Sequence, residues 1–192
     1  MKSLFKKYTI SIVALILMMS CVKDINDIPI YLDTNGKTVK AFKGAQVGDQ
    51  AILNGNTYPV VDRKLLIKML SENKDVSFTV TTLISDFSNL FNSSVYTTTT
   101  NFNQDISSWD VSNAKSMSSM FEGTVEFNQD LSFWDVSMVT DMSNMFKNAQ
   151  SFNQNLSGWC VKNITEKPEN FDLGAITWES IELKPIWGTC SN

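Results

Sequence analysis

A repeat of 25 residues occupies the middle of this chain and limits what it can fold into more than any other feature. Residues 102–126 and 127–151 align without gaps and share thirteen identical positions. The shared frame is Phe-Asn-Gln-Asp-x-Ser-x-Trp-Asp-Val-Ser-x₄-Met-Ser-x-Met-Phe, and a third copy begins at Phe152 in the same register. One copy of this length cannot bury its apolar face alone, so consecutive copies must stack on one another.

A partial copy precedes these three. The sequence Phe87-Ser-Asn-Leu-Phe91 matches the Met-Ser-x-Met-Phe part of the frame but lies thirty residues before its next occurrence. We therefore expect the polar run Thr97–Thr100 to mark a five-residue bulge. About four coils result, which satisfies the minimum of roughly three for a stable stack.

The frame predicts an α/β repeat solenoid of the leucine-rich-repeat kind. In residues 141–147, Met142, Met145 and Phe146 follow helical spacing behind Asp141, which indicates a short helix. The Phe-Asn-Gln-Asp-Leu-Ser segment fits a short strand and a turn, and parallel strands of successive coils would stack about 4.8 Å apart. We expect a small parallel sheet on one side of the coils and short helices on the other.

The segment before the repeats predicts an N-terminal cap made of a β-hairpin and a helix. Two apolar runs flank Asn54-Gly55, which favours a hairpin, although Pro59 restricts the second run to an edge strand. Asp62 can cap a helix that begins at Arg63. Such a unit would cover the apolar edge of the first coil. The expected divisions are a tether at 21–46, which includes a turn at Asp33–Gly36 and a first irregular strand, the cap at 47–79 and the repeat region at 80–192.

The first twenty residues have the pattern of a secretory signal peptide. Three lysines among the first seven residues precede a twelve-residue apolar run, too short to cross a hydrocarbon layer of about 30 Å as a helix. The run ends in Met-Met-Ser-Cys21, which resembles the lipobox of bacterial lipoproteins with Met18 in place of the usual Leu. The alternatives are an ordinary signal peptide with an incidental Cys21, or a short buried helix.

The lipobox resemblance implies cleavage before Cys21 and a diacylglycerol attached to its sulfur. Two or three acyl chains make a firm anchor, whereas a single chain would be marginal. Val22 follows the cysteine, which by similarity to Gram-negative sorting favours the outer membrane. We expect a monomer that is tied to the membrane through this lipid and exposed on the cell surface.

The composition argues against several classes of protein. The chain contains no His, which removes Ser-His-Asp and Cys-His relays and imidazole metal sites. The net charge is −4, and removal of the three leading lysines leaves 13 Lys+Arg against 20 Asp+Glu. A nucleic-acid binder normally carries a basic face instead. We expect no catalysis, no metal or other cofactor and no nucleic-acid partner.

Over residues 80–190 the Met-Ser-x-Met-Phe and Phe-Asn-Gln-Asp-Leu-Ser-x-Trp-Asp-Val-Ser blocks resemble the BspA-like family of bacterial surface proteins. The resemblance implies leucine-rich-like repeats of about 25 residues on the cell surface. It also implies binding to other surfaces, such as host matrix proteins and neighbouring bacteria, and no catalytic activity. With about four coils, this array is short for the family.

Cys160 and Cys190 are expected to form a disulfide, because Cys21 is assigned to the lipid and an exported protein meets an oxidising compartment. Such a bond would hold the last coil, whose outer face has no neighbour. Free thiols are the alternative. A metal site would need more ligands than two cysteines supply.

Trp109, Trp134 and Trp159 recur at the period of 25 and admit two interpretations. Identical aromatic residues in consecutive coils usually form an internal spine, whereas an exposed row of indoles would suit the stacking of sugar rings. The Met pairs Met117/Met120 and Met142/Met145 are expected in the core.

The repeated carboxylates Asp105, Asp110, Asp130 and Asp135 also admit two interpretations. They could cap local turns by accepting backbone N–H bonds, or together bind calcium. An Asn ladder is expected from Asn103, Asn128 and Asn153. The possible ligand-binding ladder predicted from the sequence consists of the three tryptophans together with Asp105 and Asp130. We expect it to bind a protein or a glycan; the alternative is a structural or accessory envelope lipoprotein without a soluble ligand.

Overall fold

The computed structural model of the chain describes residues 29–96 and 99–190. The expected signal peptide, Cys21 and the first part of the tether lie outside these residues, as does part of the bulge expected at Thr97–Thr100. Within the described ranges, no helix has the length and apolar character needed to cross a membrane. In chain order, the elements are β1 (Ile30–Leu32), β2 (Val39–Ala41), β3 (Gln50–Leu53), β4 (Asn56–Pro59), α1 (Arg63–Ser71) and the 3-10 helix η4 (Ile181–Leu183).

The hairpin β3–β4 and the helix α1 form where their turn and capping residues place them. Asn54 and Gly55 join the two strands with φ of 51° and 83°, the pair of positive values that a two-residue hairpin turn requires. The carboxylate of Asp62 accepts the N–H of Leu65 at 2.7 Å and so caps the first turn of α1. Arg63 at the start of this helix donates to the carbonyls of Asp86 and Ser88, which connects α1 to the first coil.

The hairpin β1–β2 corrects the expected tether at 21–46. Ile30 pairs with Ala41, and Val39 with Leu32, in an antiparallel register. Ile30, Val39 and Ala41 are buried against a cluster that includes Tyr58, Val60 and Val80. The chain is therefore folded from residue 29 onward, and only 21–28 stays a predicted tether. Strands of three residues carry too little periodicity to be recognised, and their burial depends on residues far along the chain.

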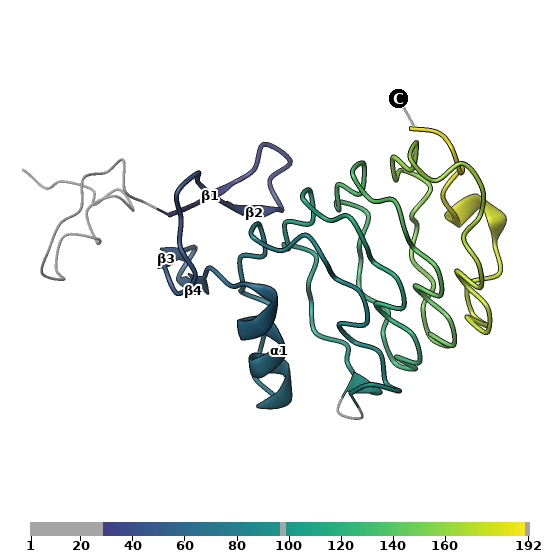
Figure 1. Ribbon diagram of the computed structural model, residues 1–192, viewed down its shortest axis with the longest axis horizontal. Coiled ribbons are helices and arrows are strands. Elements are labelled where there is room, and N and C mark those ends of the chain that lie inside the picture. The colour runs from purple at the N-terminus through teal and green to yellow at the C-terminus, as the bar shows by residue number, and fades with distance from the viewer. Residues whose placement is uncertain (1–28, 97–98, 191–192) are drawn as a thin grey trace, which may run out of the picture.

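Successive coils of the repeat region lie side by side (Figure 1) and are joined through their Met-Ser-x-Met-Phe segments. The N–H of Phe91 donates to the carbonyl of Met120, that of Phe121 to Met145 and that of Phe146 to Phe171, at 2.8–2.9 Å. Every second residue of a segment donates to the next coil in this way. The residues between them close turns on their own coil, as Met120 does to Met117 at 3.2 Å. We call residues 80–190 the array.

The structure has a run of turns at 141–147 where helical spacing predicted a helix. Ser119 and Asn144 occupy the same place in two coils and have φ of 52° and 57°, which interrupts a right-handed helix. The Phe-Asn-Gln-Asp segments are not strands either. Isolated parallel bridges instead connect Asp86 to Ser116 and Ser116 to Asp141. Met142, Met145 and Phe146 are spaced by three and four residues because consecutive turns of the chain bring these three side chains into the core. The leucine-rich-repeat assignment stays a prediction.

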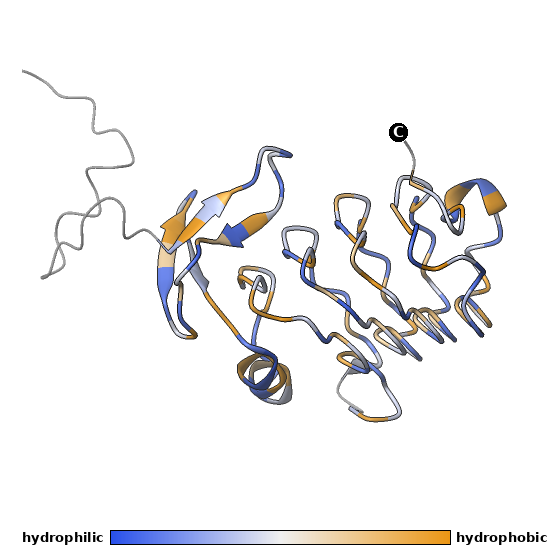
Figure 2. Ribbon diagram, turned by 45° about the horizontal axis from the view of Figure 1, so that its top comes forward, coloured by the Kyte–Doolittle hydropathy of each residue, from blue (hydrophilic) through white to orange (hydrophobic). Residues whose placement is uncertain are grey.

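Two columns of stacked phenylalanine rings fill the interior of the array. In the first, the rings of Phe91, Phe121 and Phe146 are 5.3 and 5.4 Å apart and nearly parallel. The second column contains Phe102, Phe127 and Phe152 at 5.9 Å. Within each coil the two columns touch at 4.0–4.2 Å. The hydropathy of the chain repeats from coil to coil (Figure 2), and within each column the rings of successive coils lie against one another.

The central ring of the first column is a test of this arrangement. Phe121→Ala should lower the free energy of unfolding by about 3–5 kcal/mol, because it leaves a cavity between two coils. Phe133→Ala is the matched control, since that side chain is 46% exposed, and its cost should be about 1 kcal/mol or less. Urea unfolding of both variants supplies the measurement, and equal losses would contradict the stacked core.

Candidate functional site

The three repeated tryptophans belong to the core, which corrects their assignment to a ligand-binding ladder. Trp109, Trp134 and Trp159 are buried, and the first two rings stack at 6.5 Å with an interplanar angle of 3°. The indole N–H groups of Trp134 and Trp159 donate to the main-chain carbonyls of Ile106 and Leu131 in the preceding coil, at 3.2 and 2.9 Å. The indole N–H of Trp109 donates to the carbonyl of Val76, just before the array, at 3.0 Å. The indoles therefore connect coils internally and present no face to a sugar. Met117, Met120, Met142 and Met145 are also buried, as expected.

The predicted Asn ladder is present on the exposed side of the array. The side-chain oxygen of Asn103 accepts the N–H of Asn128 at 3.0 Å, and that of Asn128 accepts the N–H of Asn153 at 2.9 Å. Gln129 and Gln154 add bonds of 2.8 Å to the same two oxygens. Each coil thus repeats the same polar contact with the coil before it.

Asp105 and Asp130 lie directly beside this ladder and shape the turns that follow it. Each carboxylate accepts the N–H of the serine two residues later, at 2.9 Å in both coils. Partial burial raises the pKa of Asp105, but the hydrogen bonds from Ser107 and the charge of Lys37 outweigh it and lower the pKa overall. The turn-capping interpretation accounts for these contacts. Among the described residues, no group of three or more Cys, Asp or Glu side chains is placed to hold a metal ion.

Asp110 has a structural role that the repeat pattern does not reveal. Its side chain is 1% exposed and accepts from the hydroxyl of Thr82, whose oxygen in turn accepts the N–H of Ala41 in β2. This chain of bonds connects the array to the first hairpin. The equivalent Asp135 is exposed, so identical repeat residues occupy different environments in consecutive coils.

The exposed polar strip beside the Phe columns is the candidate binding surface, and we call it the polar ladder. Its members recur once per coil: Asn103, Asn128, Asn153, Gln129, Gln154, Asp105, Asp130 and Asn155. Phe133 and Met138, 46% and 47% exposed, interrupt the polar surface of the same coil as Asp130. The strip offers carboxylate and amide groups at regular intervals, which suits hydrogen-bond donors on a flat or repetitive partner.

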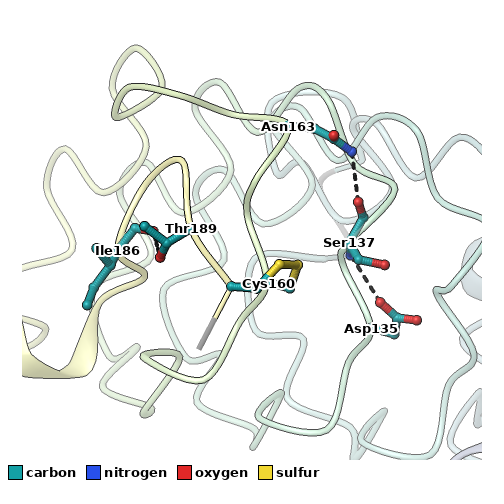
Figure 3. The surroundings of a disulfide bond; sticks show 7 residues. Asp135, Ser137, Cys160, Asn163, Ile186 and Thr189 are labelled. Atoms are coloured by element: carbon teal, nitrogen blue, oxygen red, sulfur yellow. Dashed lines mark hydrogen bonds between the residues drawn. A yellow bond between two sulfur atoms is a disulfide. The ribbon is translucent and has the colours of Figure 1, made fainter. Parts of the chain in front are cut away.

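The expected disulfide between Cys160 and Cys190 is present and lies at the end of the array (Figure 3). Cys160 stands at the repeat position of Asp135 in the coil before it. The N–H of Val161 donates to the carbonyl of Thr189, and the N–H of Gly188 donates to the carbonyl of Ile164, both at 2.8 Å. The last segment is therefore attached to the third coil by two main-chain bonds next to the disulfide.

Asp172 holds a second attachment of the terminal coil. Its carboxylate lies 2.6 Å from the ammonium group of Lys167 and 2.7 Å from that of Lys184, and the side chain is 9% exposed. Burial raises the pKa of Asp172, but the hydrogen bonds and charges of the two lysines outweigh it and lower the pKa below the ordinary value.

These features define a protein made of stacked coils with a polar exposed strip and a fastened last coil. The family model described as "Mycoplasma protein of unknown function, DUF285" matches residues 63–180, which is more than half of the 192-residue chain. The chain belongs to this family. No curated protein and no solved structure matches it.

Removal of the disulfide should destabilise the terminal coil. The bond closes a separation of 30 residues, for which loop-closure entropy predicts a contribution of roughly 3–4 kcal/mol. Cys160→Ser combined with Cys190→Ser should lower the free energy of unfolding by about that amount. Mass mapping without reductant checks the bond itself, and two free thiols in protein purified under oxidising conditions would contradict it.

The Asp172 cluster predicts an acid-dependent loss of stability. Because the pKa of the folded state is lowered, the stabilisation is present above the unfolded pKa, near 3.8, and is lost as the pH falls through the folded value. Asp172→Asn should therefore destabilise the protein at pH 7, and the loss should shrink as the pH falls below about 3.8. Glu179→Gln, at an exposed position, is the control. Urea unfolding at pH 7 and pH 3 measures the loss of stability caused by Asp172→Asn. The same loss at both pH values would argue against the ion-pair cluster.

Proposed function

We propose that this protein is a lipid-anchored surface protein of the BspA-like kind, whose array forms a small leucine-rich-like solenoid and binds a protein or glycan partner. Cys21 carries the lipid, the outer membrane holds it, and the polar ladder contacts the partner. The protein works by binding as a monomer and carries out no catalysis.

The observation that carries this proposal is the repetition of exposed polar groups on a stacked scaffold. Asn128, Asp130 and their copies occur once per coil at the surface, while the aromatic residues of the same repeats are buried. Repeated surfaces of this kind are the usual binding surfaces of coil-stacked proteins. Family membership adds only a protein family of unknown function, so the partner is inferred from the surface alone.

A structural or accessory envelope lipoprotein is the second candidate. The terminal coil favours it, because Leu173, Ile176, Ile181 and Ile186 are each more than half exposed there. Exposed aliphatic groups of this size suit a permanent contact with another envelope component. Such a component would face the periplasm and need no ligand on the polar ladder.

Location and binding can be tested together. Protease added to intact cells should release the array if it is on the surface and leave a periplasm-facing component intact. If the array is on the surface, the protein should then be immobilised and used to capture partners from host matrix and from neighbouring cells.

Asp130→Asn should reduce that capture several-fold, because it removes a negative charge from the polar ladder. The asparagine still has an oxygen to accept the N–H of Ser132, so the turn should stay intact. Asp135→Asn is the matched control, since Asp135 makes the same turn contact with Ser137 away from the ladder. Resistance of the array to protease, or equal capture by both variants, would contradict the proposed surface role of the ladder.

A further inference from the structure

The two N-terminal hairpins expose several large apolar side chains to solvent, and covering the first coil does not explain them. Tyr31 and Phe42 lie on the outer side of β1–β2, with ring centroids 4.5 Å apart. Phe42 is 51% exposed, and Ile52 in β3 is 61% exposed. Leu32 and Val47 are exposed by 41% and 46%. The opposite side of β1–β2 is already buried against the cap, so these residues do not contribute to its core.

The outer side of the first hairpin also carries positive charge, in contrast to the rest of the molecule. Lys40 lies opposite Tyr31 with its ammonium group 2.8 Å from the carboxylate of Asp33, and Lys43 is exposed beside it and forms no ion pair with another described residue. Residues 29–49 hold three Lys against two Asp, whereas residues 50–192 hold nine Lys+Arg against sixteen Asp+Glu. An anionic surface would therefore attract this hairpin and repel the array.

The position of the hairpin along the chain brings it near the proposed anchor. Seven residues lie between Cys21 and Pro29, and the eight steps from one to the other span no more than about 29 Å when fully extended. Figure 1 shows both hairpins at the end of the molecule opposite to the C-terminal coil. The hairpins are thus the part of the described fold that the anchor keeps closest to the bilayer.

We infer that the outer side of β1–β2, formed by Tyr31, Phe42, Lys40 and Lys43, lies in the interface of the phospholipid bilayer. This inference rests on the proposed lipid anchor at Cys21. Aromatic rings with lysines beside them suit this zone, because the rings enter the headgroup region while the ammonium groups stay at the phosphates. The contact fixes the direction of the array, which then points away from the membrane with its polar ladder accessible.

Tryptophan placed at the hairpin reports this contact. The full-length lipidated protein carrying Phe42→Trp is reconstituted into vesicles of phosphatidylethanolamine and phosphatidylglycerol, and emission is compared with and without brominated acyl chains. Phe133→Trp is the matched control, because Phe133 is exposed to a similar degree on the array. Difference spectra against the unsubstituted protein remove the contribution of its five native tryptophans.

The added emission of Phe42→Trp should fall at least twofold with brominated lipid, and that of Phe133→Trp should stay within about a fifth of its value. Lys43→Gln, which removes the exposed lysine beside Phe42, should weaken the quenching in Phe42→Trp. No quenching at position 42 in protein that still floats with the vesicles overturns the inference and leaves the anchor intact. Quenching at both positions overturns the orientation. Protein that does not float, with no lipid on Cys21 by mass spectrometry, overturns the anchor and the inference together.

Discussion

Contact between identical residues of neighbouring coils is the interaction on which the rest of this structure depends. Each phenylalanine of the two columns packs on its own copy, and each main-chain segment beside them donates to the next coil. A repeat buries its apolar face only when its neighbour supplies the complementary one. The first and last coils each lack a neighbour on one side, so other parts of the chain must cover their outer apolar faces. Helix α1 and the hairpins cover the first coil, and the disulfide with the Asp172 cluster secures the last.

The same arrangement determines which repeated residues are available to a partner. The aromatic and methionine side chains that recur in the frame are buried between coils, so the recurring groups left at the surface are short polar ones from the turns. The polar ladder and the tryptophan spine come from one repeat frame, yet only the ladder is accessible. A surface of this type, held above a membrane by a lipid and a membrane-contacting hairpin, would present the same groups several times to a partner.

The sequence predicted the period, the Asn54-Gly55 hairpin, the helix behind Asp62, the Asn ladder and the disulfide, because each depends on local chemistry or on fixed spacing. It did not predict the hairpin β1–β2, whose three-residue strands are held by distant residues. It also assigned a helix to 141–147, since the apolar spacing of consecutive turns imitates that of a helix. The tryptophans admitted two interpretations until their burial was known.

By itself the sequence determined that identical segments must stack, because a 25-residue period leaves each copy with an apolar face to cover. The tertiary structure alone decided what each repeated residue does. Asp110 is buried and bonded toward β2, whereas Asp135 at the same repeat position is exposed. The two coils share one frame but have different neighbours, because the first coil meets the cap and the second does not.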